Sequence, residues 1–180
     1  MFSYYDLTVT DVERGSRYGG NIRVHVTKGK NRNVSKNVEL LLKEEEDAGL
    51  YEIKTYEKFA NRVKQAKNDF MNFLYDMKKE GKTIVGNSCP GRCVTLLNYY
   101  GVDSDLIPYI AEQPTSLKLD MYLPGKQIPV VNNERLLQEQ PDYVVLLAWH
   151  YAEPIMNQLK DRGLKSNFII PLPDLKILEN

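Results

Sequence analysis

One loop of the sequence, Gly-Asn-Ser-Cys-Pro-Gly-Arg at residues 86–92, combines residue types that suit an anion. It follows a short apolar stretch and opens a helix, with Pro90 close to the first turn. A helix N-terminus supplies free N–H groups and partial positive charge, and Arg92 can neutralise a phosphate. The pattern favours an anion or nucleotide site in which Gly86, Ser88, Pro90 and Arg92 contact the ligand. A tight strand-to-helix turn without a ligand explains the same residues.

The loop matches neither of two common phosphate motifs. It is not Gly-x-Gly-x-x-Gly, because residue 88 is serine, and no Gly-Lys-Ser/Thr follows as in a P-loop. Cys89 and Cys93 lie four positions apart, but a metal site would need further ligands, and the two histidines are distant in sequence. We expect free thiols. The helix N-terminus can lower the pKa of Cys89, but no Cys-His-Asn pattern supports a nucleophile.

Two further segments carry polar or aromatic residues that can line a site. His150 follows Trp149 at the end of the most apolar stretch of the chain, where functional groups collect in α/β folds. A structural histidine in the loop is the alternative. The Pro/Gly loop 122–130 carries Tyr122 and Lys126, which can close over a phosphorylated ligand or form a plain surface turn.

These residues must be positioned by the last hundred residues, where strand and helix patterns alternate. Strands are predicted at 83–86, 106–113, 143–149 and 167–173, with helices at 90–100, 132–139 and 152–162. This alternation predicts an α/β fold with a mostly parallel sheet. In such sheets ligands bind at the carboxyl ends of strands, beside a topological switch point. The important loops are therefore 86–92, 149–153 and 171–174.

The first part of the chain predicts a hairpin and a helix. Residues 5–14 and 21–28 alternate apolar and polar side chains, as half-buried strands do, around a glycine-rich reversal. A lone hairpin is marginal in water, so this one must pack on something else. A helix follows, with Ser35 as its N-cap and Gly49 as its end. His25 lies on the polar face of the second strand, and we expect it at the surface.

Residues 52–80 carry the strongest periodic pattern in the chain. Apolar residues step by three and four along one face of a helix about 40 Å long, namely Tyr56, Phe59, Val63, Ala66, Phe70, Phe73 and Met77. Such a seam either spans two domains or lines a dimer interface, or it packs on the chain's own sheet. The sequence leaves both interpretations open.

Composition excludes several classes of protein. The 180 residues hold 24 Lys and Arg against 24 Asp and Glu, so no net charge attracts nucleic acid or an anionic membrane. No apolar run reaches the roughly 18 residues of a membrane span, and the N-terminus does not resemble a secretory signal. Two cysteines cannot build a disulfide scaffold. We therefore expect a cytoplasmic protein.

A series of segments in fixed order resembles the C-terminal, Rossmann-like domain of the sugar C-methyltransferases that depend on S-adenosylmethionine (SAM). The segments are GKTIVGNSCPGRCVTLLNYYGV, DLIPYIAEQ, YLPGKQIPV, RLLQEQPDYVVLLAWHY and NFIIPLP, preceded by LTVTDVER and YGGNIRVHV. The family pattern differs at Tyr18, where it has histidine, at Ser88, where it has glycine, and at His150, where it has asparagine.

The resemblance implies a nucleotide-sugar binding domain without its own SAM-binding, zinc-binding or catalytic segment. It implies three parts: residues 1–30, a hairpin like the end of a SAM domain; residues 31–81, a helical arm; and residues 82–180, a Rossmann-like α/β domain. No cofactor is expected on this chain itself, and SAM would be held by a partner chain that docks on the hairpin. Gly86, Ser88, Pro90, Arg92, Tyr122, Lys126, Trp149 and His150 are the expected substrate contacts.

Two other functions are compatible with the sequence. A scaffold or regulatory module would dimerise through residues 52–80 and bind no small molecule. A free-standing binder of nicotinamide dinucleotides would need Gly-x-Gly-x-x-Gly and an acidic residue after the second strand, for which Glu112 is the only candidate.

Overall fold

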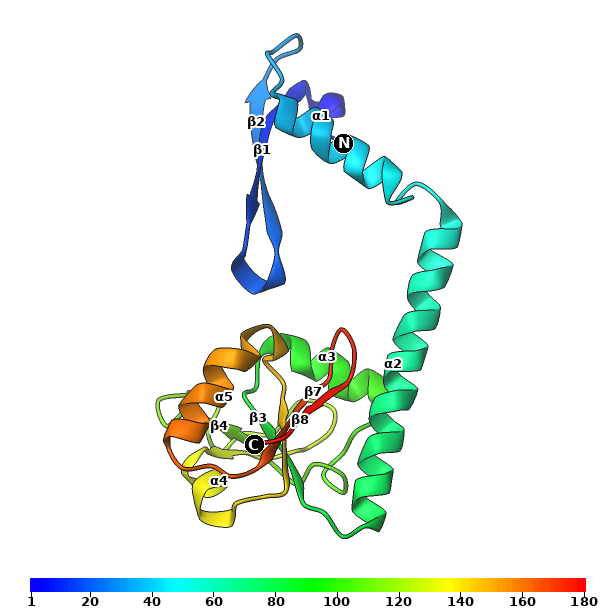
Figure 1. Cartoon of the computed structure of the whole chain (residues 1–180). Coiled ribbons are helices and arrows are strands. Elements are labelled where there is room, and N and C mark those ends of the chain that lie inside the picture. Colours follow the sequence, from blue (N-terminus) through cyan, green and yellow to red (C-terminus); the bar gives the residue numbers. More distant parts are fainter. The chain divides into compact units, whose positions relative to one another are not determined.

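The computed structural model describes all 180 residues and contains two compact units, residues 1–61 and residues 62–180 (Figure 1). The boundary falls inside one long helix, α2 (Ile53–Lys79). The three-part division at residues 30 and 81 stays a prediction.

The first unit consists of a β-hairpin and a helix. The elements before α2 are η1 (Phe2–Tyr5), β1 (Leu7–Gly15), η2 (Arg17–Gly19), β2 (Asn21–Lys28) and α1 (Lys36–Asp47). β1 and β2 pair antiparallel, with Val12 opposite Val24, and the reversal forms at the predicted glycine-rich segment. This part of the sequence prediction is confirmed.

Ser35 joins α1 to β1 in a way the sequence did not predict. It occupies the N-cap position, but its hydroxyl donates to Asp11 Oδ1 (2.5 Å) and caps no helix N–H group. Asn37 Nδ2 donates to the same oxygen (3.1 Å). The ionised Asp11 carboxylate makes a stronger hydrogen bond with the Ser35 hydroxyl than a neutral acceptor would. The two side-chain hydrogen bonds, that of Ser35 first, hold the pKa of Asp11 below its usual value.

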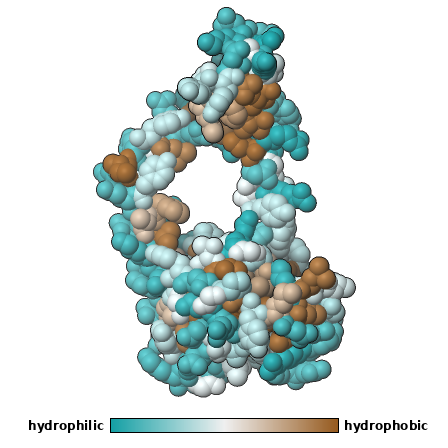
Figure 2. Space-filling model, turned by 180° about the vertical axis from the view of Figure 1, so that it is seen from behind, coloured by the Kyte–Doolittle hydropathy of each residue, from teal (hydrophilic) through white to brown (hydrophobic).

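The first unit has no buried residue anywhere in residues 1–61. The prediction of a half-buried second strand is wrong, because Ile22 is 47% and Val24 36% exposed. The physical reason is that α1 packs chiefly on β1, so no further layer covers the side chains of β2. Apolar surface is visible on this unit in Figure 2.

The second unit is built on a six-stranded sheet in the order β5-β4-β3-β6-β7-β8. Its strands are β3 (Ile84–Asn87), β4 (Ile110–Glu112), β5 (Val130–Asn132), β6 (Tyr143–Leu146), β7 (Asn167–Ile170) and β8 (Lys176–Leu178). All pairs are parallel except β7 with β8. Numbered along the chain within the sheet, the order is 3-2-1-4-5-6, that of the doubly wound, Rossmann-type fold. The predicted fold class is confirmed.

Sequence periodicity missed β5 and β8, which are three residues each and too short for an alternating pattern. The predicted strand 143–149 is shorter than expected. It ends at Leu146, and Trp149 starts a 3-10 turn, η3 (Trp149–Tyr151). The apolar run continues past the strand because Leu147 and Ala148 are also buried.

Helices cover both faces of the sheet in this unit. They are α2 from residue 62 onward, α3 (Gly91–Tyr100), α4 (Glu134–Glu139) and α5 (Ala152–Asp161). Neighbouring residues of one strand enter different core clusters: Val145 packs with residues of α2 and α3, whereas Val144 packs with residues of α4 and α5. The core therefore lies on both sides of one sheet, which explains the continuous apolar run in β6.

The aromatic seam of α2 differs between its two ends. Phe70 is fully buried and packs against Tyr100 of α3, with ring centroids 5.7 Å apart. Phe73 and Met77 lie partly buried against the same core. Tyr56 and Phe59 are more than half exposed. The interpretation that the helix packs on its own sheet holds for the C-terminal half of the seam.

Candidate functional site

The loops after β3 and β6 lie at the point where the strand order reverses. β3 is flanked by β4 on one side and β6 on the other, and the chain leaves β3 toward β4 through α3. The Leu147 N–H donates to the Asn87 carbonyl (3.0 Å), so β3 and β6 end side by side. In open α/β sheets this carboxyl-end junction is where ligands bind. The structure thus brings the predicted loops 86–92 and 149–153 to one edge.

Gly86 and Ser88 shape the turn that leaves β3. A Cβ atom on Gly86 would lie 3.0 Å from Ile110 Cγ1 and 3.1 Å from Leu147 Cδ1, so a side chain there would force both neighbours to shift. Ser88 has φ +66°, the left-handed conformation that glycine adopts most easily. With Gly91 at the start of α3, positions 86, 88 and 91 stand where the glycines of Gly-x-Gly-x-x-Gly stand. The backbone at Ser88 therefore adopts the left-handed conformation that glycine usually supplies at this position of the motif.

Two residues that the sequence analysis did not place in the site hold this loop. Glu112, at the end of β4, accepts the Cys89 N–H at Oε2 (2.9 Å). Lys118 Nζ donates to the Cys89 carbonyl (2.6 Å) and lies 3.9 Å from the same carboxylate oxygen. The sequence named Glu112 only as the acidic residue that a dinucleotide binder would need after its second strand, and nothing in the sequence pointed to its contact with Cys89.

Arg92, Trp149 and His150 meet across the junction. The Arg92 Cζ atom lies 6.0 Å from the centroid of the Trp149 ring, within range of a cation–π contact. His150 packs edge-on to Trp149 with ring centroids 6.0 Å apart. Burial, and then the charge of Arg92, lower the pKa of His150, so the imidazole is neutral at neutral pH. The cluster offers a cation, an aromatic face and a neutral imidazole.

Cys89 and Cys93 are free and buried, as predicted, with their sulfur atoms 3.8 Å apart. The hydrogen bond between them lowers the pKa of Cys89, with Lys118 adding to the effect, and the same bond and burial raise the pKa of Cys93. Cys93 belongs to the core under α3. The structure contains no group of three or more His, Cys, Asp or Glu side chains that could hold a metal ion.

The structure does not bring Tyr122 and Lys126 to this junction. Their loop is attached to the C-terminal end of α3, because Asn98 Nδ2 donates to the Pro124 carbonyl (2.9 Å). Tyr122 forms a bridge with Pro129, just before β5 begins, and its side chain is 65% exposed. Because β5 runs parallel to its neighbour β4, its first residue lies at the edge of the sheet opposite to the carboxyl ends of the strands. Tyr122 therefore lies away from the junction. The six other predicted contacts therefore form the group at the junction.

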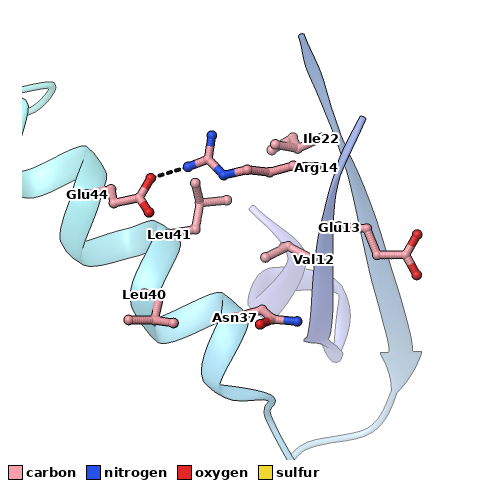
Figure 3. Close-up of a pocket in the computed structure, with 8 residues that line it drawn as sticks. All are labelled: Val12, Glu13, Arg14, Ile22, Asn37, Leu40, Leu41 and Glu44. Carbon is pink, nitrogen blue, oxygen red and sulfur yellow. Dashed lines mark hydrogen bonds and ion pairs between the residues drawn. The ribbon is translucent and has the colours of Figure 1, made fainter. Parts of the chain in front are cut away.

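A separate groove lies in the first unit, between the hairpin and α1 (Figure 3). It has a volume of about 370 Å³ and is lined by apolar residues such as Val12 and Leu41. Arg14 and Glu44 form an ion pair across it. None of the predicted site residues lines this groove. No helix of the chain is both long enough and apolar enough to span a membrane.

Comparison with known proteins identifies the family. The sequence matches the family described as "C-methyltransferase C-terminal domain" over residues 16–173. It is 30% identical to the C-methyltransferase NovU of Streptomyces niveus over 99% of this chain, which corresponds to 43% of the length of NovU. The chain therefore spans less than half of that relative. The matched region contains both β3 and β6 with their loops, and the chain belongs to the C-methyltransferase C-terminal domain family.

Proposed function

We propose that this chain is the nucleotide-sugar binding domain of a SAM-dependent C-methyltransferase in the cytoplasm. The observation that carries the proposal is the junction of β3 and β6, where Arg92 and Trp149 lie together beside a glycine-type turn. Arg92 would meet the phosphates, Trp149 would pack on a base or sugar ring, and His150 would hydrogen-bond as a neutral group. Gly86, Ser88 and Pro90 would supply the backbone surface.

The remaining chemistry of methyl transfer belongs, in this proposal, to a partner. The chain would bind no SAM itself, and a SAM-binding chain would dock on the first unit. Exposed apolar residues of that unit, among them Ile22, Leu40 and Phe59, support such a role because water-exposed apolar surface favours association. Deleting residues 1–30 should weaken this assembly, measured as mass in solution after mixing with a SAM-binding methyltransferase. An unchanged mass would contradict the docking role.

The binding proposal is tested by thermal unfolding of the full chain with nucleotide-sugars, nucleoside diphosphates, SAM and NAD. A ligand at 100 times its dissociation constant adds about 2.7 kcal/mol, which shifts the midpoint by several degrees. We expect a shift with a nucleotide-sugar and none with SAM. Arg92→Ala should weaken the ligand about tenfold, whereas Arg32→Ala, which removes the same charge in the first unit, should not. No shift with any ligand would exclude the binding proposal.

The exposed end of the α2 seam favours a second candidate, a scaffold that dimerises through this helix. Tyr56 is 52% and Phe59 56% exposed on one helix face. Phe59→Glu should then dissociate a dimer in sedimentation experiments, while Lys58→Glu, one position away and outside the seam, should not. A scaffold would respond to no small molecule, which separates it from the first proposal.

A further inference from the structure

Glu112 places a negative charge on one side of the β3–α3 loop, and Arg92 places a positive charge on the other. We propose that Glu112 binds a hydroxyl group on the pentose of the nucleoside, so that the nucleoside lies over β4 and its phosphates lie toward β6. This inference rests on the proposed nucleotide-sugar function and adds a direction for the ligand.

The carboxylate of Glu112 is positioned and still able to accept hydrogen bonds. Its Oε2 accepts from the Cys89 N–H (2.9 Å) and its Oε1 from the Gln113 N–H (3.1 Å). Two carboxylate oxygens offer about four lone-pair sites, so about two remain for a ligand. The side chain is 13% exposed, which leaves it reachable from solvent but restricted in movement. Lys118 supports this orientation by bonding to the Cys89 carbonyl (2.6 Å).

Glu112 disfavours a phosphate on its own side of the loop, because the Lys118 ammonium there is already paired with this carboxylate (3.9 Å) and bonded to the Cys89 carbonyl (2.6 Å). The Cys89 N–H, which a phosphate would otherwise use, is already taken by this carboxylate. A phosphate there would meet a like charge, whereas a neutral hydroxyl can donate to it. On the other side, Arg92 stands against Trp149 and can receive the negative charge. The loop therefore distinguishes the two ends of a nucleotide.

The place of Glu112 in the sheet supports the same assignment. β4 is the second strand of the sheet along the chain and lies directly beside β3. In doubly wound sheets, an acidic residue at the end of this strand, about twenty residues after the glycine turn, takes a ribose hydroxyl. Glu112 lies on the same strand and at the same end, and in this chain it also accepts the Cys89 N–H of the turn.

The test compares ribonucleoside diphosphates with their 2′,3′-dideoxy counterparts, by calorimetric titration of the full chain. The wild-type chain should bind the form with hydroxyls about tenfold more tightly, since a hydrogen bond to a charged group is lost in the other. Glu112→Gln should reduce this preference to about twofold or less. Glu179→Gln, which removes one negative charge at an exposed position, should keep the full preference. Inorganic pyrophosphate should bind Glu112→Gln at least as tightly as wild type.

The outcomes separate the two proposals. If nucleotides bind but wild type does not distinguish the two pentoses, or Glu112→Gln retains the distinction, the role of Glu112 is overturned and nucleotide binding stands. If neither nucleoside diphosphates nor nucleotide-sugars bind at all, both proposals fail. The wild-type comparison needs no variant, so a folding defect in Glu112→Gln cannot obscure the result.

Discussion

The two units of this chain use apolar residues to opposite effect. In residues 62–180, apolar side chains fill a core on both sides of the sheet, and residues such as Val144 and Val145 are fully buried. In residues 1–61 the same residue types alternate just as regularly, yet none of them is buried. An apolar pattern therefore marks a surface to be covered, and the number of layers decides whether the chain can cover that surface itself.

The difference in burial also suits the two units to different roles, ligand binding in the second unit and docking of a partner on the first. The junction of β3 and β6 rests on strands whose side chains are buried, which fixes the position of Arg92 and Trp149. The hairpin and α1 are joined by a few polar contacts, chiefly those of Asp11. A rigid unit suits a ligand site, and an uncovered one suits a surface that a partner completes.

The largest expected contrast is in amide hydrogen exchange of the isolated chain. Amides of β3 and β6 should open only with global unfolding, at roughly 5–15 kcal/mol, whereas those of β1 and β2 should open at much lower cost. We expect exchange in the hairpin to be at least about a thousandfold faster. Mass spectrometry of peptides from both units measures this directly. Equal protection in the hairpin and in β6 would contradict the comparison.

A core truncation in the second unit should be far more costly than one in the first. Phe168 is fully buried, so Phe168→Ala should lower the free energy of unfolding by about 3–5 kcal/mol. Leu40 is 58% exposed, and Leu40→Ala should change it by less than about 0.5 kcal/mol. Urea unfolding followed by fluorescence of Trp149, the one tryptophan, reports on the second unit. A loss at Leu40→Ala as large as that at Phe168→Ala would show that the units are coupled.

Two glycines of the site loop sharpen the comparison within the second unit. Gly86→Ala forces a Cβ atom against Ile110 and Leu147, and should destabilise the chain by about 1–3 kcal/mol. Gly91→Ala meets no atom within 4 Å at the start of α3 and should be neutral or slightly stabilising. Thermal unfolding of both variants distinguishes them. Equal midpoints would mean that the turn after β3 is not closely packed.

The smallest expected effect concerns two carboxylates, one in each unit. Asp142 accepts the Thr83 N–H and hydroxyl, both at 2.8 Å, and the backbone bond is the first cause of its lowered pKa. Its ionised form stabilises the fold above its unfolded pKa, and this contribution is lost as pH falls through the lowered folded value. Asp142→Asn should cost about 1 kcal/mol at neutral pH and nothing at strongly acidic pH.

Asp11 provides the matched control for this effect. Its pKa is lowered in the same way, by the Ser35 and Asn37 hydrogen bonds. Because it joins α1 to β1 in the first unit, Asp11→Asn should leave the Trp149 unfolding transition unchanged at every pH. Urea titrations at several pH values compare the two variants. An equal shift of the Trp149 unfolding transition in Asp11→Asn and Asp142→Asn would contradict the distinction between the units.

Much of the fold, and the loops that form the candidate site, can be predicted from the sequence. Residues 83–86 and 143–149 are apolar enough to mark the central strands, and the loops after them carry the glycines and Arg92 in one case and His150 in the other. β5 and β8 could not be predicted, because three residues carry no period, and β4 is equally short and occupies only Ile110–Glu112 of the strand predicted at 106–113. The exposure of Ile22 and Val24 could not be predicted either, because an alternating strand looks the same whether or not a second layer covers it.

The sequence by itself determined the alternation of strands and helices, the α/β class and the residues of the loop at 86–92, because these depend on local residue types and their periods. Only the tertiary structure decided that Arg92 meets Trp149 and that Glu112 takes the Cys89 N–H. It also removed Tyr122 and Lys126 from the junction. The physical reason is that strand order and loop attachment set these distances, and contacts between residues far apart in the chain leave no periodic trace in the sequence.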